Sequence, residues 1–156
     1  MNRTSEETDL TTGTPAEPTE APLPVPESWL DRVLDLEVGP VAHGGHCVAR
    51  ADGRVVFVRH ALPGERVRAV VTEDRGGSFC RADAVEVLTA SPDRVPQPCP
   101  YAGPGKCGGC DWQHATGPAQ REIKATVIRE QFSRIAGFDL GEVFAGVEEL
   151  PGGLLG

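Results

Sequence analysis

The sequence is poor in the residues that build large cores and membrane spans. Aromatic residues make up 5% of the 156 residues and methionine occurs once, so any hydrophobic core must be small. No apolar run approaches the roughly 20 residues of a membrane-spanning helix. No apolar segment follows Arg3, as one would in a secretory signal. We therefore expect a cytoplasmic protein without a membrane partner.

Basic residues are also in the minority, but they are unevenly placed. The chain has 23 acidic and 15 basic residues, a formal net charge of -8, which taken whole argues against a nucleic-acid-binding protein. Residues 1–28 hold six acidic residues and one arginine, whereas residues 29–98 hold ten acidic residues, nine arginines and no lysine. The acidity therefore lies mainly in a tail, and the whole-chain charge is misleading for the arginine-rich middle.

Composition divides the chain into five segments. Glycine and proline are frequent (19 and 14 residues), which favours turns and short strands over a helical bundle. We expect a disordered, acidic Pro/Thr-rich tail over 1–28 and a small β-barrel over 29–90. A Cys-rich loop over 91–114 and an amphipathic helical segment over 115–137 follow. Residues 138–156 are weakly patterned and are interpreted as the truncated start of a further domain.

Short apolar alternations predict a mainly β fold. Asp52-Gly53 lies between two apolar runs and predicts a tight hairpin. Five antiparallel strands are expected, around residues 34–38, 46–50, 54–59, 66–71 and 79–88. So many short strands in about 60 residues favour a closed, OB-like barrel, because closure removes exposed strand edges. We expect Cys47 and Cys80 inside this barrel and Phe57 in its core.

One helix is predicted over residues 116–136. Thr116 is a suitable N-cap, Pro118 lies in the first turn and Gly137 can end the helix. One face carries Ile123, Val127, Ile128, Phe132 and Ile135. Nothing in the chain is large enough to cover this face, so its expected partner is a missing downstream domain. The last three of these residues should then be exposed and prone to self-association.

Three cysteines form the sharpest motif. Cys99, Cys107 and Cys110 follow a C-x7-C-x2-C pattern, with two glycines between the last two. Without an export signal, such a cluster indicates a metal or iron–sulfur site more than disulfides. Lys106 would favour the thiolate form. Structural zinc and four-iron clusters normally take four ligands. His114 could complete a Cys3His zinc site, and Cys47 or Cys80 could contribute if they were not strand residues.

The barrel segment contains the stretches Val41-Ala-His-Gly-Gly-His-Cys-Val-Ala-Arg50 and Arg54-Val-Val-Phe-Val-Arg-His-Ala-Leu-Pro-Gly-Glu65. These two stretches resemble a TRAM domain, the small RNA-binding β-barrel that precedes many RNA-modifying enzymes. Ser91-Pro-Asp-Arg-Val-Pro-Gln-Pro-Cys-Pro100 and Cys107-Gly-Gly-Cys-Asp-Trp-Gln-His114 follow. In this order they resemble the N-terminal part of the bacterial TRAM-containing uracil-C5 RNA methyltransferases. The resemblance covers about residues 33–140.

The resemblance implies both cofactors and missing parts. In that family the cysteines hold a 4Fe–4S cluster, and the enzyme methylates uridine in ribosomal or transfer RNA with S-adenosylmethionine. Cys99, Cys107 and Cys110 carry over as three cluster ligands, although the gap after Cys99 is slightly longer than usual. The fourth cysteine, the S-adenosylmethionine domain and the catalytic residues would lie beyond residue 156. No catalytic residue carries over, so this chain alone should not methylate RNA.

The barrel is expected to contact RNA through arginines. Arginine binds phosphate through its planar fork and stacks on bases. The candidates are Arg50, Arg54, Arg59, Arg66 and Arg68. Gln113 and His114 adjoin the cysteines and would orient the cluster or contact RNA.

Two alternatives remain open. A standalone TRAM module would bind RNA in a salt-dependent way without chemistry. A small structural zinc protein would use Cys99, Cys107, Cys110 and His114, would be colourless and would lose its metal in His114→Ala.

Overall fold

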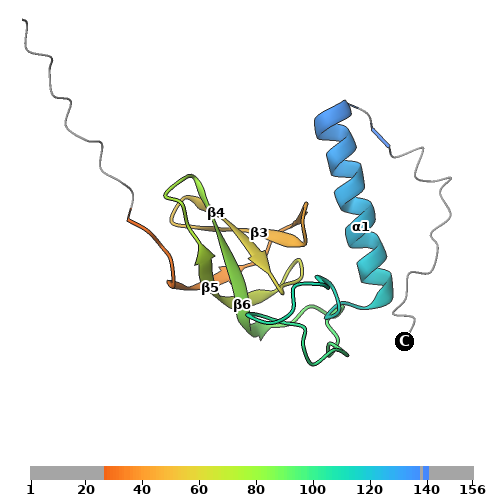
Figure 1. Cartoon of the computed structure of the whole chain (residues 1–156). Coiled ribbons are helices and arrows are strands. Elements are labelled where there is room, and N and C mark those ends of the chain that lie inside the picture. The colour runs from red at the N-terminus through yellow and green to blue at the C-terminus, as the bar shows by residue number, and fades with distance from the viewer. Residues whose placement is uncertain (1–26, 138, 141–156) are drawn as a thin grey trace, which may run out of the picture.

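A computed structural model describes residues 27–137 and 139–140 of the chain. Six strands precede one α-helix, which continues into a single π-helical turn (Figure 1). The elements are β1 (Val33–Glu37), β2 (Val41–Ala42), β3 (His46–Ala51), β4 (Arg54–Arg59), β5 (Arg66–Glu73), β6 (Phe79–Thr89), α1 (Gly117–Gln131) and the turn Phe132–Ala136. The expected acidic tail and the expected start of a further domain lie almost entirely outside the described residues.

The strands form a small barrel, as predicted. They pair in the order β1-β5-β6-β4-β3-β2, and the chain that leaves β1 bends back onto β3. There the N–H of Gly39 donates to the carbonyl of Val48 (2.7 Å), and the N–H of Val48 donates to the carbonyl of Pro40 (2.8 Å). A Cβ at Gly39 would lie 2.7 Å from the Val48 carbonyl oxygen, so only glycine permits this approach. The bend at Gly39-Pro40 also explains why six strands occur where five were expected.

Not every strand pair is antiparallel, which corrects the prediction. β4 and β6 run parallel, with Val56 opposite Cys80. The reason is topological: β5 separates them in sequence and pairs antiparallel with the other edge of β6. The β3–β4 hairpin is confirmed, and Asp52 and Gly53 both take positive φ (46° and 79°), as the tight turn requires.

The core is built from small side chains that point inward from alternate strand positions. Cys47 and Cys80 are 0% and 1% exposed, so their predicted burial in the barrel is confirmed. The prediction for Phe57 is wrong. Val56 and Val58 take the two inward positions of β4, and the alternation of a strand turns Phe57 to the outer face.

The helix begins and ends as predicted. Thr116 Oγ1 accepts a hydrogen bond from the N–H of Ala119 (3.4 Å), and Gly137 ends the helical path with φ 68°. Ile123 joins the barrel core, so the first half of the apolar face is covered within the chain. The second half is exposed, as expected: Ile128 (42%), Phe132 (47%) and Ile135 (79%). Self-association through this face stays a prediction.

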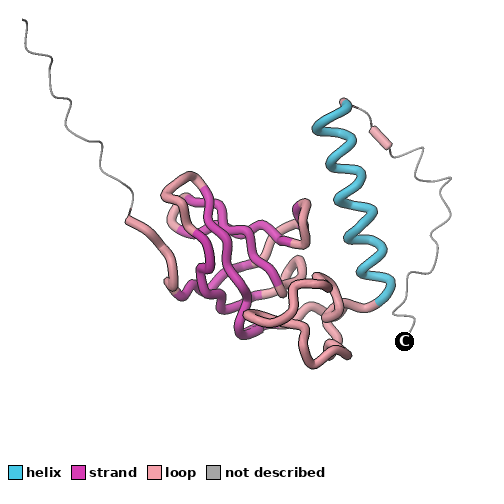
Figure 2. Tube along the Cα trace, in the orientation of Figure 1, coloured by secondary structure: helices cyan, strands magenta, loops and turns pink. Residues whose placement is uncertain are grey.

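A buried ion pair between Glu65 and Arg94 fastens the long loop between β6 and α1 to the barrel. The path of this loop, drawn in pink, can be followed in Figure 2. Glu65 is 1% exposed, and its carboxylate accepts hydrogen bonds from Arg94 and from the N–H groups of Leu62 (2.8 Å) and Ser91 (3.1 Å). Arg94 also donates to the carbonyl of His60 (2.9 Å). Burial by itself would raise the pKa of Glu65, but these donors outweigh it and hold the pKa below its usual value.

We predict that Arg94→Met destabilises the fold by about 3–5 kcal/mol, because it leaves the Glu65 carboxylate buried without its charged partner. Urea denaturation followed by circular dichroism measures the loss. Arg68→Met is the matched control: Arg68 pairs with carboxylates at the surface, where ion pairs contribute little. Equal losses in the two variants would contradict the role assigned to Arg94.

Candidate nucleic-acid interface

The cysteines lie in a loop whose two ends are tied together. Arg94 and Ala115 form an isolated β-bridge, and the N–H of Val95 donates to the carbonyl of His114 (2.9 Å). Within the loop, the N–H of Cys99 donates to the side-chain oxygen of Gln113 (3.2 Å). The N–H of Cys107 donates to the carbonyl of Tyr101 (3.0 Å). Backbone and amide hydrogen bonds therefore help to position the motif.

The three motif cysteines are accessible, but they do not form a metal site in this conformation. Cys107 and Cys110 are exposed and Cys99 is partly buried. Across residues 27–137 and 139–140, no group of three or more His, Cys, Asp or Glu side chains is placed to hold a metal ion. Three thiols are also one fewer than a 4Fe–4S cluster needs. The described loop thus supplies three thiols that would have to move together to bind a cluster, and the iron–sulfur and zinc assignments stay predictions.

An ion pair joins the Cys loop to the barrel. Asp111, next to Cys110, accepts a short hydrogen bond from Arg59 at the end of β4. On its other side Asp111 packs against Gly45, where a Cβ would lie 2.4 Å from the Asp111 Cγ. Arg59 is thus held by the loop, and one end of the loop is held against the β2–β3 turn.

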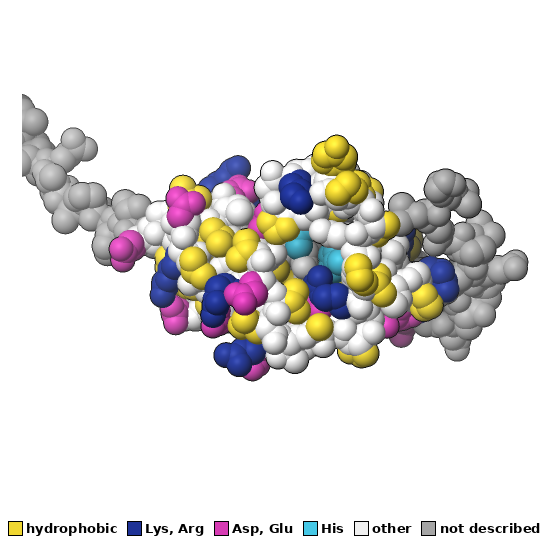
Figure 3. Space-filling model, turned by 90° about the horizontal axis from the view of Figure 1, so that it is seen from below, with side chains coloured by type: hydrophobic (Ala, Val, Ile, Leu, Met, Phe, Trp, Pro, Cys, Tyr) yellow, Lys and Arg dark blue, Asp and Glu magenta, His cyan; other side chains and the backbone are white. Residues whose placement is uncertain are grey.

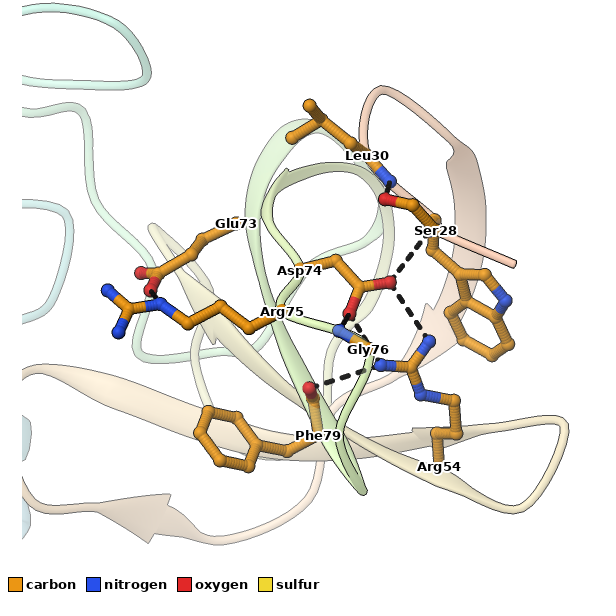
Figure 4. A network of polar contacts seen from close by, with 9 residues as sticks. Ser28, Leu30, Arg54, Glu73, Asp74, Arg75, Gly76 and Phe79 are labelled. Atoms are coloured by element: carbon orange, nitrogen blue, oxygen red, sulfur yellow. Dashed lines mark hydrogen bonds and ion pairs between the residues drawn. The ribbon is translucent and has the colours of Figure 1, made fainter. Parts of the chain in front are cut away.

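Arg54 is held in place by hydrogen bonds and by an aromatic ring. It donates two hydrogen bonds to Asp74 (2.7 and 3.0 Å), and its guanidinium lies 4.5 Å from the ring centroid of Trp29. Asp74 also accepts from the N–H groups of Trp29 (2.7 Å) and Gly76 (2.8 Å) (Figure 4). The hydrogen bonds from Arg54 and these N–H groups hold the pKa of Asp74 far below its usual value. This network leaves Arg54 little freedom to bind a phosphate.

The remaining predicted arginines fall into two places. Arg66 and Arg68 lie on β5, across β6 from β4, and Arg68 donates to Asp35 (2.9 Å) and Glu86 (2.8 Å). Arg50 lies at the end of β3 beside the hairpin. Both Arg50 and Arg66 are exposed, and in the part of the chain that the structure describes neither forms an ion pair. The five arginines therefore do not form one cluster.

The structure reveals aromatic side chains that the sequence analysis did not assign to a site. The Phe57 ring meets those of His46 and Phe79 edge to face, with centroids 6.2 and 5.5 Å apart. The Arg81 guanidinium lies 6.0 Å from the Phe79 ring centroid. We call His46, Phe57, Phe79 and Arg81 the aromatic face. The signal was present in the sequence: with Val56 and Val58 inward, the strand period turns Phe57 outward.

Arginines lie on and beside the aromatic face, and two of them pair with carboxylates, Arg59 with Asp111 and Arg81 with Glu73. Arg59 is two residues from Phe57 on the same side of β4, and Arg50 pairs opposite Val55, which pairs opposite Phe79. Burial lowers the pKa of His46, and the charges of Arg59 and Arg81 lower it further. His46 is therefore an uncharged ring at neutral pH. Flat rings flanked by arginines are the combination that stacks bases and contacts phosphates in single-strand binding.

None of the helices in the described residues has the length and apolar character needed to cross a membrane.

The barrel and the segment after it are similar to known proteins. Residues 31–85 match the family model described as TRAM domain. The chain is 67% identical over 105 residues to an uncharacterized RNA methyltransferase of Streptomyces avermitilis, a match that covers 66% of this chain and 24% of that protein. A similar protein of Streptomyces coelicolor is 59% identical over 118 residues, which covers 74% and 26%.

A third relative has a more specific name. The chain is 40% identical over 120 residues to the 23S rRNA (uracil(1939)-C(5))-methyltransferase RlmD of Alkalilimnicola ehrlichii, a match that covers 77% of this chain and 26% of that protein. In all three cases the chain spans about a quarter of the relative's length.

The burial of the five cysteines predicts two classes of thiol. With metal removed, Cys107 and Cys110 should react rapidly with Ellman's reagent at pH 8, because both are exposed. Burial raises the pKa of Cys47 to about 12 and also raises the pKa of Cys80, so these two should react only after unfolding. Absorbance at 412 nm follows both phases. A double Cys107→Ser, Cys110→Ser variant should lose the fast phase, whereas fast reaction of all five thiols would contradict the described burial.

Proposed function

Starting from the TRAM domain that residues 31–85 form, we propose that the chain is the RNA-binding, iron–sulfur-binding N-terminal part of a uracil-C5 RNA methyltransferase that uses S-adenosylmethionine. Its relatives are named RNA methyltransferases, one of them a 23S rRNA uracil-C5 methyltransferase. The substrate is a uridine in ribosomal or transfer RNA, and the site of action is the cytoplasm. The S-adenosylmethionine domain and the reacting groups belong to the rest of such an enzyme.

The aromatic face carries the RNA-binding proposal. Phe79 is 45% exposed and meets Phe57 edge to face, so a base can stack on this pair without moving the core. Base–aromatic stacking is worth about 1–3 kcal/mol per base and tolerates any base, because every base has a π-face. Arg50 is exposed beside these rings and has no ion pair among the described residues, which makes it the arginine best suited to a phosphate.

The exposed half of the helix supports a further domain as a partner. Phe132 and Ile135 present apolar side chains to solvent, while Ile123 in the first half of the same helix is buried in the barrel core. We propose that the methyltransferase domain covers the second half. The helix would then hold the RNA-binding barrel at a fixed position beside the reacting groups.

We also propose that Cys99, Cys107 and Cys110 supply three ligands to a 4Fe–4S cluster. Two of the thiols are free at the surface and Cys99 lies in the same loop. The fourth ligand would come from outside the described residues. When bound, the cluster would stiffen the loop, and through the Asp111–Arg59 pair it would fix an arginine beside the aromatic face.

We predict that Phe79→Ala weakens binding of a labelled single-stranded octauridylate about tenfold, in line with about 1–3 kcal/mol for a stacked base. Fluorescence anisotropy at fixed salt measures the change. Val33→Ala is the control, because Val33 is also exposed (56%) but lies on β1, which β5 separates from β6 in the sheet. Equal affinities of the two variants would remove the aromatic face as the RNA-binding surface.

A matched pair of arginines tests the electrostatic part. Arg50→Ala should lower the slope of log affinity against log salt concentration by about one, as expected for a lost phosphate contact. Arg68→Ala should change the slope less, because Asp35 and Glu86 already neutralise this side chain. A larger effect of Arg68→Ala would move the phosphate path to β5.

Anaerobic incubation with iron and sulfide tests the cluster proposal. We expect a brown product with broad absorbance near 400 nm, lost in the double Cys107→Ser, Cys110→Ser variant and retained in Cys80→Ala, because Cys80 is buried in the barrel. Iron and sulfide analysis quantifies the product. A colourless protein that instead binds one zinc ion per chain would favour the zinc alternative.

A further inference from the structure

A cavity of about 460 Å³ lies between β6 and the loop that follows it. Val85 and Val87 of β6 line one side, and Pro96 and Pro104 of the loop line the other. Its size is within the range of about 300–1,000 Å³ that is usual for small-ligand sites. The walls are thus apolar surfaces contributed by rigid side chains.

Histidine and arginine side chains complete the cavity. His60, Arg94 and His114 contribute to its lining, and in Figure 3 histidine side chains adjoin a basic side chain near the middle of one face of the molecule. Arg94 is already committed to Glu65 and to the carbonyl of His60. Glu86 and Gln97 also line the cavity, but Glu86 pairs with Arg68 and Gln97 donates to the carbonyl of Ala102. The histidines therefore remain as polar groups for a ligand.

His114 has an unmet hydrogen bond. It is 4% exposed, its ring donates to the backbone carbonyl of Ala61, and its Nε2 has no partner. Burial, reinforced by the charge of Arg94, lowers the pKa of His114 to about 4. At neutral pH Nε2 therefore carries a lone pair. A buried acceptor without a donor is unfavourable. Nε2 is closed to water in the described conformation, so a ligand whose donor reaches it after a small movement of the cavity wall relieves this cost.

The matching ligand is a flat, mostly apolar ring with an N–H group on its edge. The faces of such a ring suit valine and proline walls, and the N–H suits Nε2 of His114. We propose that the cavity receives one unstacked nucleobase of the bound RNA, whose edge N–H donates to Nε2 of His114. This proposal rests on the RNA-binding function proposed above and adds a specific site for one base.

The position of the cavity agrees with a bound strand that crosses the aromatic face. His60 follows the last residue of β4 and lies three residues beyond Phe57, roughly 10 Å along an extended chain. His60 also takes a φ of 62°, a left-handed conformation that non-glycine residues seldom adopt. This turn ends the strand where the outer sheet surface gives way to the cavity. RNA stacked on Phe57 can therefore place a neighbouring base in it.

Nitrogen-detected NMR of the histidine side chains in the whole 156-residue chain tests the hydrogen bond. The probes are the four nucleoside 5′-monophosphates and, as the baseless control, ribose 5-phosphate. We expect at least one nucleotide to move the His114 Nε2 signal upfield, as an acceptor nitrogen does on hydrogen bonding, while ribose 5-phosphate leaves it in place. A His114 signal that none of the nucleotides moves, even at saturation, would overturn the proposal.

His114→Leu is not a clean test, because it also removes the hydrogen bond to Ala61 and so can perturb folding. A variant that fills the cavity gives the second test instead. Val85→Trp fills the cavity from an outward strand position that is 52% exposed. It should weaken octauridylate binding about tenfold, the loss expected for one bound base. Val33→Trp, from a β1 position that is 56% exposed, should not.

The experiments distinguish failure of the base site from failure of the RNA-binding function. If the unmodified chain and both tryptophan variants bind octauridylate equally, the cavity is not a base site, while the RNA-binding function stands. If the unmodified chain does not bind octauridylate at any salt concentration, the RNA-binding function fails and the base site fails with it.

Discussion

The rest of the structure depends on one buried carboxylate. Glu65 lies immediately before β5, and its hydrogen bonds join the turn at Leu62 to the loop after β6, at Ser91 and Arg94. Arg94 extends the contact to the His60 carbonyl at the end of β4. One anion therefore joins two strand ends and a loop. A charge buried in this way is stable only with all its donors present, so these segments keep their positions together.

One strand of the barrel, β4, contributes both to the core and to the outer face. The inward positions of β4 supply the valines of the core, and its outward positions supply Phe57 and Arg59. Short side chains inside keep the barrel narrow, so the larger aromatic and cationic groups gather outside. The scarcity of aromatic residues noted in the sequence therefore has a positional meaning, because the barrel places two of its phenylalanines where a ligand can touch them.

Local patterns predicted local structure well. The Asp52-Gly53 hairpin, the Thr116 cap and the Gly137 terminus follow from backbone preferences of a few residues, and the structure contains all three. The sequence did not predict which arginines are free. Arg54 is neutralised by Asp74, twenty positions away, and Arg59 by Asp111, 52 positions away. Such pairings depend on strand order, and the parallel β4–β6 contact that sets this order has no short-range signature.

That parallel contact also bears on how the chain reaches its native state. β4 cannot pair with β6 until the chain through β6 has been made, and the residues paired between β1 and β5 are 29 to 37 positions apart. Closing such long loops early is entropically unfavourable, and barrels with this kind of contact pattern fold in milliseconds to seconds. During synthesis the first strand therefore leaves the ribosome well before its neighbour exists. Its hydrophobic positions stay exposed for that interval, so the barrel can close only after translation has passed β6.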